Sequence, residues 1–387
     1  MDLELNEDQM AIQASAREFA RQVVAPRAKE IDATAEWPDD IVRQCGEMGF
    51  MGVAVPEEYG GSGLDTVSYA VIIEELSAAC ATTGVICSVN NSLACDPVLD
   101  WGSEELKRKY LEPMAQGRLL GCYALSEPAS GSDAAGLECM AVRDGDSYIL
   151  NGTKNFITNG VKADVCVVYA TMDKAAGNKG VLALVVERDF KGYSVGAEDS
   201  KLGIRASGSC QIHFEDCRVP VGNRLAGEGE GFKVAMRTLD GGRIGIAAQA
   251  VGIGRAAIEA ALAYSKERQT FGKPISEHQA IQFMLADMAV EMDAARLLTW
   301  KAASLKDERK KDFKKRWSVE AATAKLFASE AANHAADRCV QIFGGYGYVA
   351  EYPAERHFRD ARITEIYEGT SEIQRIVIAA DVLRRAD

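Results

Sequence analysis

A carboxylate near the end of the chain has neighbours that suit proton chemistry. Glu368 lies between an aromatic residue, Tyr367, and a glycine, Gly369, and two hydroxyl residues follow. Glycine after the acid indicates a turn at which backbone comes close to another group. In a dry turn, burial would raise the pKa of Glu368 and make it a proton acceptor. The alternative is a solvated acid near a helix N-terminus, where the helix dipole favours negative charge.

Two further stretches offer polar groups where loops are expected. Residues 123–133 read YALSEPASGSD and combine hydroxyl side chains, small residues and glycine. Such a loop can offer backbone N–H and hydroxyl donors to a polar ligand, although an ordinary proline–glycine turn has the same composition. Residues 155–160 read NFITNG. They could place an aromatic ring and a hydroxyl beside a flat ligand, or form a strand with a buried phenylalanine and a surface threonine.

Two arginines need partners. Residues 240–243 read DGGR at what is interpreted as a helix start, where a cation opposes the helix dipole. We therefore expect an anionic partner for Arg243, either a protein carboxylate or a ligand. Residues 267–274 read ERQTFGKP after a long helical pattern. The cations there could cap the helix, or Arg268 with Thr270 could meet a phosphate.

Composition limits the classes of function. The chain has 387 residues, 47% hydrophobic and 26% charged, as in an ordinary globular protein with two or three domains or one large core. The net charge of −13 argues against nucleic-acid binding and against an anionic membrane surface as partner. No stretch is interpreted as a membrane span. The acidic N-terminus resembles neither a signal nor a transit peptide, so we expect a cytoplasmic protein of bacterial type, or a mitochondrial matrix protein if the chain is a matured one.

Cysteine and histidine usage gives no metal site. The ten cysteines lack metal-ligand spacing, and in a large core-forming chain they are expected to be reduced and buried. Only four histidines occur and none lies in an HExxH motif, so no metal is expected.

The spacing of apolar residues divides the chain into three parts. Residues 1–120 have helical spacing. Residues 121–228 contain short β-branched runs between turns, which predict a small β-barrel or sandwich. Residues 229–387 return to helical spacing and predict long antiparallel helices. The predicted fold is thus α+β and mainly α: an N-terminal helical domain, a middle β domain and a C-terminal four-helix bundle.

Several local features are predicted within these parts. A helix is expected to begin at Asn6, and another to span residues 66–79. The Asn-Gly pair at residues 151–152 predicts a hairpin turn. The charged residues 306–315 predict an exposed turn between helices, and the glycines of residues 344–347 are expected to end a helix.

Taken in order, these motifs resemble those of the acyl-CoA dehydrogenase family, and the resemblance covers the whole chain. The ordered set reads YALSEPASGSD, NFITNG, ERQTFGKPISEHQ, QIFGGYGY and RHFRDARITEIYEGTSEIQ. Within the family, the chain looks most like the short-chain (butyryl-CoA) dehydrogenases. The resemblance implies FAD-dependent oxidation of an acyl-CoA to its trans-2-enoyl-CoA, as in fatty-acid β-oxidation. Glu368 would abstract the proton from Cα while a hydride passes from Cβ to flavin N5.

The resemblance also assigns the remaining site residues. Some relatives carry the base just before the arginine matching Arg243, but that residue here is Gly242, which favours Glu368. Contacts to FAD are implied for Tyr123, Leu125, Ser126, Phe156, Thr158, Thr370 and Glu372, and to the FAD of a neighbouring subunit for Arg268, Thr270, Phe271, Gln341 and Gly345. Substrate contacts are implied for Ser132, Asp240, Arg243, Tyr367 and Gly369.

The resemblance implies partners and leaves alternatives open. FAD shared between chains implies a homotetramer built as a dimer of dimers, and reduced FAD would be reoxidised by an electron-transfer flavoprotein. The same machinery could act on a branched, cyclic or dicarboxylic acyl-CoA. A hypothesis of another class is a non-catalytic helical protein that binds acyl-CoA.

Overall fold

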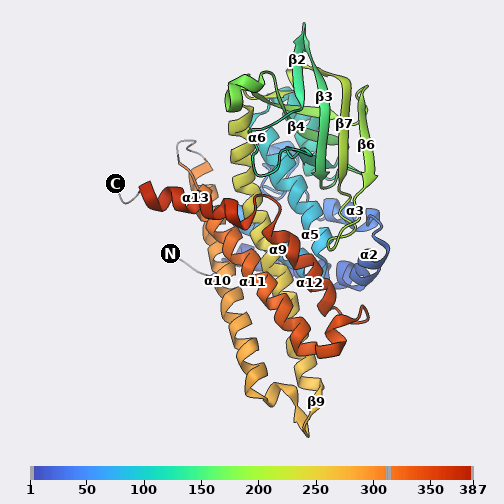
Figure 1. Ribbon diagram of the computed structural model, residues 1–387, viewed down its shortest axis with the longest axis vertical. Coiled ribbons are helices and arrows are strands. Elements are labelled where there is room, and N and C mark those ends of the chain that lie inside the picture. Colours follow the sequence, from blue (N-terminus) through green and yellow to red (C-terminus); the bar gives the residue numbers. More distant parts are fainter. Residues whose placement is uncertain (1–3, 311, 313–314, 385–387) are drawn as a thin grey trace.

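The computed structural model describes residues 4–310, 312 and 315–384 of the 387-residue chain. Helices from the two ends of the chain pack together, and the middle of the chain forms a sheet at one end of the long axis (Figure 1). The predicted α+β, mainly helical fold is confirmed.

The N-terminal part is helical, as predicted. Helix α1 (Glu7–Phe19) begins at Asn6, whose side chain accepts a hydrogen bond from the Gln9 N–H while the Gln9 side chain reaches back, forming a capping box. Helix α4 (Thr66–Ala79) has the predicted bounds and lies in the core. The other elements are η1 (Ala20–Val24), η2 (Ala25–Arg27), α2 (Ala28–Thr34), α3 (Asp39–Glu47), η3 (Glu57–Tyr59), α5 (Ala81–Ser88), η4 (Val89–Cys95), α6 (Asp96–Trp101), α7 (Glu104–Leu106), η5 (Lys107–Leu111) and α8 (Glu112–Ala115).

The middle of the chain forms one eight-stranded sheet in the order β6-β7-β3-β2-β4-β5-β8, with β1 also paired to β4. The strands are β1 (Gly121–Ala124), β2 (Met140–Asp144), β3 (Ser147–Ile157), β4 (Val165–Thr171), β5 (Val181–Glu187), β6 (Tyr193–Glu198), β7 (Cys210–Pro220) and β8 (Arg224–Leu225). Alternate residues of β4 pack against helices on one face and against other strands of the same sheet on the other. Burial on both faces explains why β4 is a continuous apolar run.

The hairpin turn predicted at residues 151–152 is wrong. Strand β3 runs through this pair without interruption, and the turn to β2 lies earlier, where Asp144 pairs with Ser147. Gly152 has a φ of 150° and marks a shift of register between β3 and β7. A Cβ on Gly152 would lie 2.7 Å from the Cα of Cys139, so this glycine permits a close approach of backbone within the sheet.

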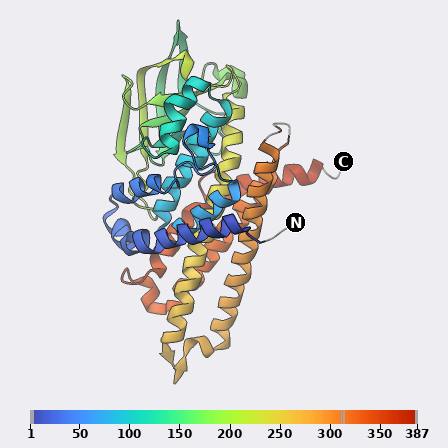
Figure 2. The ribbon, with the colours of Figure 1, turned by 180° about the vertical axis from the view of Figure 1, so that it is seen from behind.

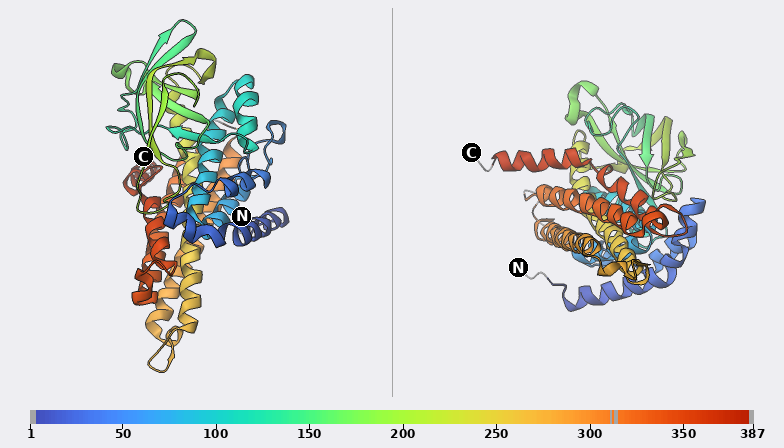
Figure 3. Two further views of the ribbon diagram at one scale, coloured as in Figure 1. Left: turned by 90° about the vertical axis from the view of Figure 1, so that its right-hand side faces the viewer. Right: turned by 60° about the horizontal axis from the view of Figure 1, so that its bottom comes forward.

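The C-terminal part is built on long helices that lie side by side (Figures 1 and 3). These are α9 (Gly231–Glu267), α10 (Gln279–Lys310) and α11 (Ser318–Phe343), with the shorter α12 (Ala354–Arg362) and α13 (Ser371–Arg384) against them. The small elements are η6 (Lys174–Gly180), η7 (Val221–Asn223), β9 (Gln269–Thr270), β10 (Lys273–Pro274), η8 (Ile275–Glu277), η9 (Gly344–Tyr348) and η10 (Ile363–Glu365). As predicted, α11 ends where the glycines of η9 begin.

Helix α9 is the central element of the fold. It packs against α4, α10 and α11 and also against strand β5, so it is covered on several sides. Among the helices of the described chain, α9 alone has the length and composition to cross a membrane, but 67% of its apolar window is buried inside the protein. Its apolar length is therefore explained by its place in the core.

Two other local predictions need correction. Arg243 does not start a helix but lies well inside α9. Lys306 of the charged stretch is not exposed, because it lies in α10, is buried and pairs with Asp96. Residues 311, 313 and 314 of that stretch lie outside the described residues. By contrast, all ten cysteines are unpaired and buried, as predicted.

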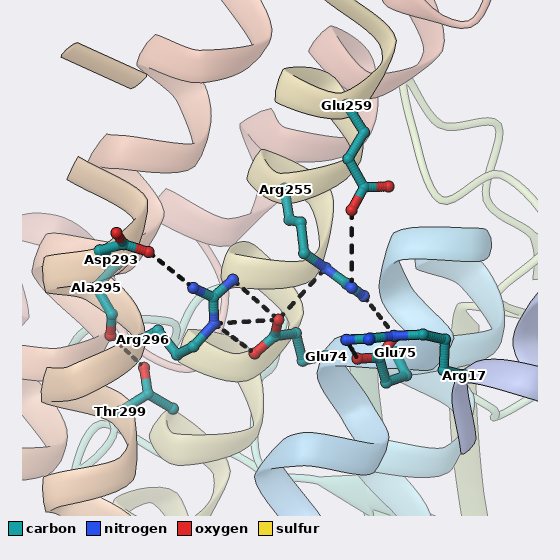
Figure 4. Close-up of polar contacts among 9 residues, drawn as sticks. All are labelled: Arg17, Glu74, Glu75, Arg255, Glu259, Asp293, Ala295, Arg296 and Thr299. Atoms are coloured by element: carbon teal, nitrogen blue, oxygen red, sulfur yellow. Dashed lines mark hydrogen bonds and ion pairs between the residues drawn. The ribbon is translucent and has the colours of Figure 1, made fainter. Parts of the chain in front are cut away.

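A buried ion-pair network ties the N-terminal helices to the bundle (Figure 4). Glu74 and Glu75 of α4 are 3% and 2% exposed. Glu75 binds Arg17 of α1 at 2.8 Å and Arg255 of α9 at 2.6 Å. Glu74 binds Arg296 of α10 at 3.1 Å. Figure 2, which views the molecule from behind, shows the N-terminal helices lying across the long helices of the bundle. The network therefore joins four helices that are far apart in sequence.

Candidate active site

A cavity of about 190 Å³ lies where the sheet, helix α9 and the loop before α13 meet. It is lined by Val89, Leu93, Tyr123, Leu125, Ser126, Gly131, Ser132, Ala134, Phe156, Ile157, Thr158, Met236, Leu239, Arg243, Tyr367, Glu368, Gly369 and Ile373. The fold thus brings together predicted residues from four stretches of the chain, 123–133, 155–160, 240–243 and 366–374, the first and last of which lie more than 200 positions apart in the sequence.

The loop that carries Glu368 has an unusual backbone. Glu368 has a φ of 52° and Gly369 a φ of 92°, both in the left-handed region. For a glutamate this conformation costs about 1–3 kcal/mol and must be held by its surroundings. Gln374 of α13 holds it, since its Nε2 donates to the Glu368 carbonyl at 3.2 Å and to the Gly369 carbonyl at 2.8 Å. A Cβ on Gly369 would lie 2.7 Å from that Nε2, which explains the glycine.

The carboxyl group of Glu368 is shielded from solvent, and its pKa is raised. Part of the residue borders the cavity, but its Oε2 atom is buried and has no hydrogen-bond partner within the described chain. Burial raises the pKa of Glu368 to about 8, while Lys325 and Arg243 oppose the rise. The alternative of a solvated acid at a helix start is therefore wrong.

Arg243 has the anionic partner that the sequence predicted, and it is a protein carboxylate. Its Nη1 donates to Asp240 Oδ1 at 2.8 Å, and both residues are buried. The hydroxyl of Ser318 donates to the other oxygen of Asp240. Arg243 Nε has no partner among the described residues. Arg243 lines the cavity and also a wider hollow of about 740 Å³, which Asp240 and Arg309 line as well.

Another part of the cavity wall comes from the sheet and the loop after β1. Tyr123 at the end of β1 packs its ring 5.0 Å from that of Tyr169. Phe156, near the end of β3, has a φ of 59° and is 70% exposed, so the alternative of a buried strand phenylalanine is wrong. Thr158 follows it on the cavity wall. The loop after β1 is more than a plain turn, because Leu125 and Ser126 also face this space.

A buried ion pair joins the two stretches of that wall. Lys154 Nζ lies 2.6 Å from Glu127 Oε1, with the two side chains 0% and 2% exposed. The same ammonium donates to the Leu125 carbonyl at 3.1 Å. The Asn155 N–H donates to the Ser126 carbonyl at 2.9 Å. Strand β3 and the loop after β1 are thus fixed to each other by contacts that solvent does not reach.

The remaining predicted residues do not reach this cavity. Arg268, Thr270 and Phe271 lie at the β9–β10 hairpin, at the opposite end of the molecule from the sheet (Figure 1). Phe271 is 96% exposed there. Residues Gln341 and Gly345 lie near the same end, since the Arg268 guanidinium is 5.6 Å from the Tyr346 ring centroid. Thr370 and Glu372 border the start of α13 outside the cavity.

Several residues of the site were not predicted. Met236 and Leu239 line the cavity from α9 with Arg243. Their spacing of three and four residues places them on one face of a helix with Arg243. This signal is present in the sequence if α9 begins at Gly231 and not near Arg243. Lys325 and Gln374, which bind the carbonyl of Gly369, lie in helical stretches whose sequence carries no comparable signal.

Comparisons with known proteins agree along the whole chain. Family models match for the acyl-CoA dehydrogenase N-terminal domain at residues 6–118, the middle domain at residues 122–217 and the C-terminal domain at residues 229–383. The mitochondrial short-chain specific acyl-CoA dehydrogenase of Mus musculus is 50% identical over 99% of this chain and 92% of its own length.

Two solved structures are also similar. A chain of the structure described as the electron transferring flavoprotein of Acidaminococcus fermentans is 49% identical, with a TM-score of 0.97 over 99% of this chain and 100% of that one. The butyryl-CoA dehydrogenase of Megasphaera elsdenii is 43% identical, with a TM-score of 0.95 over 99% of this chain and 100% of that one.

Proposed function

The chain belongs to the acyl-CoA dehydrogenase family of flavoprotein oxidoreductases, and we propose that it oxidises a short acyl-CoA, with butyryl-CoA as the best candidate, to the trans-2-enoyl-CoA. The observation that carries this proposal is the buried, unpartnered carboxylate oxygen of Glu368 at a cavity of about 190 Å³. Relatives named for short-chain substrates support the choice of acyl group.

The residues of the cavity fit FAD as the cofactor. The exposed ring of Phe156 offers an aromatic surface, and the hydroxyls of Ser126 and Thr158 offer hydrogen bonds beside it. When bound there, FAD supplies the acceptor for the hydride that leaves Cβ. Glu368 and Arg243 each keep a buried polar atom without a hydrogen-bond partner in the described part of the chain, as expected for groups that meet a ligand.

Glu368 performs the proton chemistry in this proposal. The α-proton of a thioester is too weakly acidic for an ordinary carboxylate in water, so a base with a raised pKa and stabilisation of the developing negative charge are both required. Burial supplies the first, since it raises the pKa of Glu368 to about 8. The Glu368 backbone N–H would donate a hydrogen bond to the thioester oxygen and stabilise the enolate-like charge.

The wider hollow beyond Arg243 suits the coenzyme A arm. Its charged lining consists of four arginines, Arg243, Arg309, Arg316 and Arg384, and three carboxylates, Asp240, Glu320 and Asp381, and the excess of positive charge complements phosphates. Ser132 and Tyr367 would bind the substrate closer to the thioester, because both line the cavity. Asp240 would act through Arg243, which it holds at 2.8 Å.

We propose a homotetramer, and the position of the hairpin residues supports a contact between subunits. Arg268, Thr270 and Phe271 are remote from the cavity of their own chain, so they would contact FAD bound to a neighbouring subunit, together with Gln341 and Gly345. We propose an electron-transfer flavoprotein as the oxidant of reduced FAD, in line with the similarity to a chain from such a structure. One relative is a mitochondrial protein, but the localisation of this chain, bacterial cytoplasm or mitochondrial matrix, stays a prediction.

Anaerobic flavin bleaching tests the proposal. The purified holoenzyme should be yellow and lose its visible flavin absorbance when butyryl-CoA is added. Glu368→Gln should keep FAD but stop the bleaching, whereas Glu365→Gln, a nearby acid that pairs with Arg362, should bleach normally. A colourless protein would favour the non-catalytic alternative. A series of longer, branched, cyclic and dicarboxylic acyl-CoAs would show whether butyryl-CoA is the preferred substrate.

A further inference from the structure

Lys325 is a buried lysine in the bundle that the proposed reaction does not use. It lies in α11 and is 0% exposed, and among the described residues it forms no ion pair. A buried charge without a counter-ion is costly, and such lysines usually have a partner or lose their proton. Its position therefore needs an explanation.

Among the described residues, the Lys325 side chain makes one hydrogen bond, and it leads to the base loop, which we define as residues 366–370. Lys325 Nζ donates to the Gly369 carbonyl at 2.7 Å. Gln374 Nε2 donates to the same oxygen at 2.8 Å. The peptide carbonyl next to Glu368 is thus held from α11 and from α13 at once. This double contact can support the left-handed backbone at Glu368 and Gly369, whose φ values are 52° and 92°.

We propose that Lys325 is a positioning residue for the reaction at Glu368, fixing the base loop through the Gly369 carbonyl and supplying a positive charge beside the Glu368 carboxylate. The inference rests on the proposed function of Glu368 as the base. It assigns Lys325 two separable effects, one geometric and one electrostatic.

The charged groups around Lys325 support the electrostatic effect. Burial lowers the pKa of Lys325 to about 8, while Glu368, Glu365 and Glu372 raise it and Arg243 lowers it. Glu365 is paired with Arg362, and Arg243 with Asp240. Within the described part of the chain Glu368 has no such ion pair, and Lys325 opposes the rise of its pKa more strongly than Arg243 does. Lys325 and Glu368 therefore each favour the charged form of the other.

Substitutions at Lys325 separate the two effects. Lys325→Met removes the charge and the hydrogen bond, and Lys325→Gln removes the charge but keeps a donor for the Gly369 carbonyl. For both holoenzymes, the rising limb of the plot of kcat/KM for butyryl-CoA against pH should shift to higher pH by about one unit. The rate of flavin reduction at pH 7, which lies on this limb, should therefore fall about tenfold. The plateau above the limb should fall in Lys325→Met and stay near the wild-type value in Lys325→Gln. Lys325→Arg should restore the position of the limb.

Lys306→Met is a matched control, because it also removes a buried helical lysine, 4% exposed, but one that pairs with Asp96. It should lower the melting temperature and leave the limb in place. A wild-type limb and plateau in FAD-bound Lys325→Met would overturn the inference, and Lys325→Gln decides the electrostatic effect if the Met variant does not fold. Wild-type enzyme that fails to bleach with any acyl-CoA would overturn the proposed function instead.

Discussion

Gly242 of α9 and Glu368 of the base loop share one space: a Cβ built on Gly242 would lie 1.7 Å from Glu368 Oε2. Gly242→Ala should therefore displace the carboxylate, and a shift of about 1 Å can reduce a rate about 100-fold. We expect such a loss in the rate of flavin reduction by butyryl-CoA, measured by stopped flow. Gly241→Ala is the control, because its Cβ would meet only side-chain ends, Asp96 Oδ2 at 3.2 Å and Lys306 Nζ at 3.3 Å. Equal rates in the two variants would contradict the prediction.

The pH dependence of the reaction should report the buried base. Burial raises the pKa of Glu368 to about 8, and only the ionised carboxylate accepts a proton. The value of kcat/KM for butyryl-CoA should therefore rise about tenfold per pH unit below pH 8 and level off above it. If kcat/KM instead levelled off above about pH 4.5, the ordinary pKa of a glutamate, the result would contradict a pKa raised by burial.

The same raised pKa predicts a sign for stability. Between about pH 4.5 and pH 8 the folded chain keeps a proton on Glu368 that the unfolded chain releases, so the contribution of this group to folding is lost as the pH rises through that range. Glu368→Gln cannot ionise, and its stability relative to the wild type should therefore increase from pH 5 to pH 8. Thermal unfolding of the two holoenzymes across this range measures the difference. A constant difference would mean that the pKa of Glu368 is not raised.

The buried pair between Lys154 and Glu127 should be essential for the sheet wall of the site. Lys154→Met leaves the Glu127 carboxylate buried without its cation, which costs about 3–5 kcal/mol of unfolding free energy. Lys109→Met breaks a pair with Glu187 whose side chains are 53% and 30% exposed, and should cost less than about 1 kcal/mol. Urea unfolding measures both, and FAD retention should fall only in the first variant.

The network of Figure 4 predicts an order of effects. Arg255 binds both Glu74 and Glu75, whereas Arg296 binds only Glu74 of these two. Arg255→Met should therefore lower the unfolding free energy more than Arg296→Met. Arg27→Met, which breaks an exposed pair with Glu30, should change it by less than about 1 kcal/mol. The reverse order for the first two variants would show that the network is not held together by Arg255.

The exposed hairpin predicts an effect on cofactor binding alone. Phe271 is 96% exposed, so its removal should not affect the unfolding of a single chain. If it packs against FAD of a neighbouring subunit, Phe271→Ala loses about 1.5 kcal/mol or more and should weaken FAD binding about tenfold. Val142→Ala, at another exposed apolar position, should leave FAD binding unchanged. FAD titrations of the apoprotein measure both.

Much of the fold could be predicted because local signals agreed with tertiary packing. The Asn6 cap, the bounds of α4 and the end of α11 follow from short-range hydrogen bonding and helix spacing, and the structure confirms them. The prediction of a turn at residues 151–152 is wrong because Gly152 permits a close approach to Cys139, the residue before β2, and local sequence rules do not include such a contact between separate segments. Arg243 was misplaced for a similar reason, since burial against many neighbours keeps α9 helical through its paired glycines.

The sequence by itself determined the types of residue that can do chemistry here: an acid before a glycine, two hydroxyl-bearing loops and the family to which the chain belongs. Only the tertiary structure decided which state those residues adopt. Burial, not sequence, raises the pKa of Glu368, and packing places Lys325, 43 positions away, at 2.7 Å from the carbonyl beside it. Desolvation and distances between remote segments depend on the whole fold, and for that reason the base was recognisable in the sequence while the groups that hold and tune it were not.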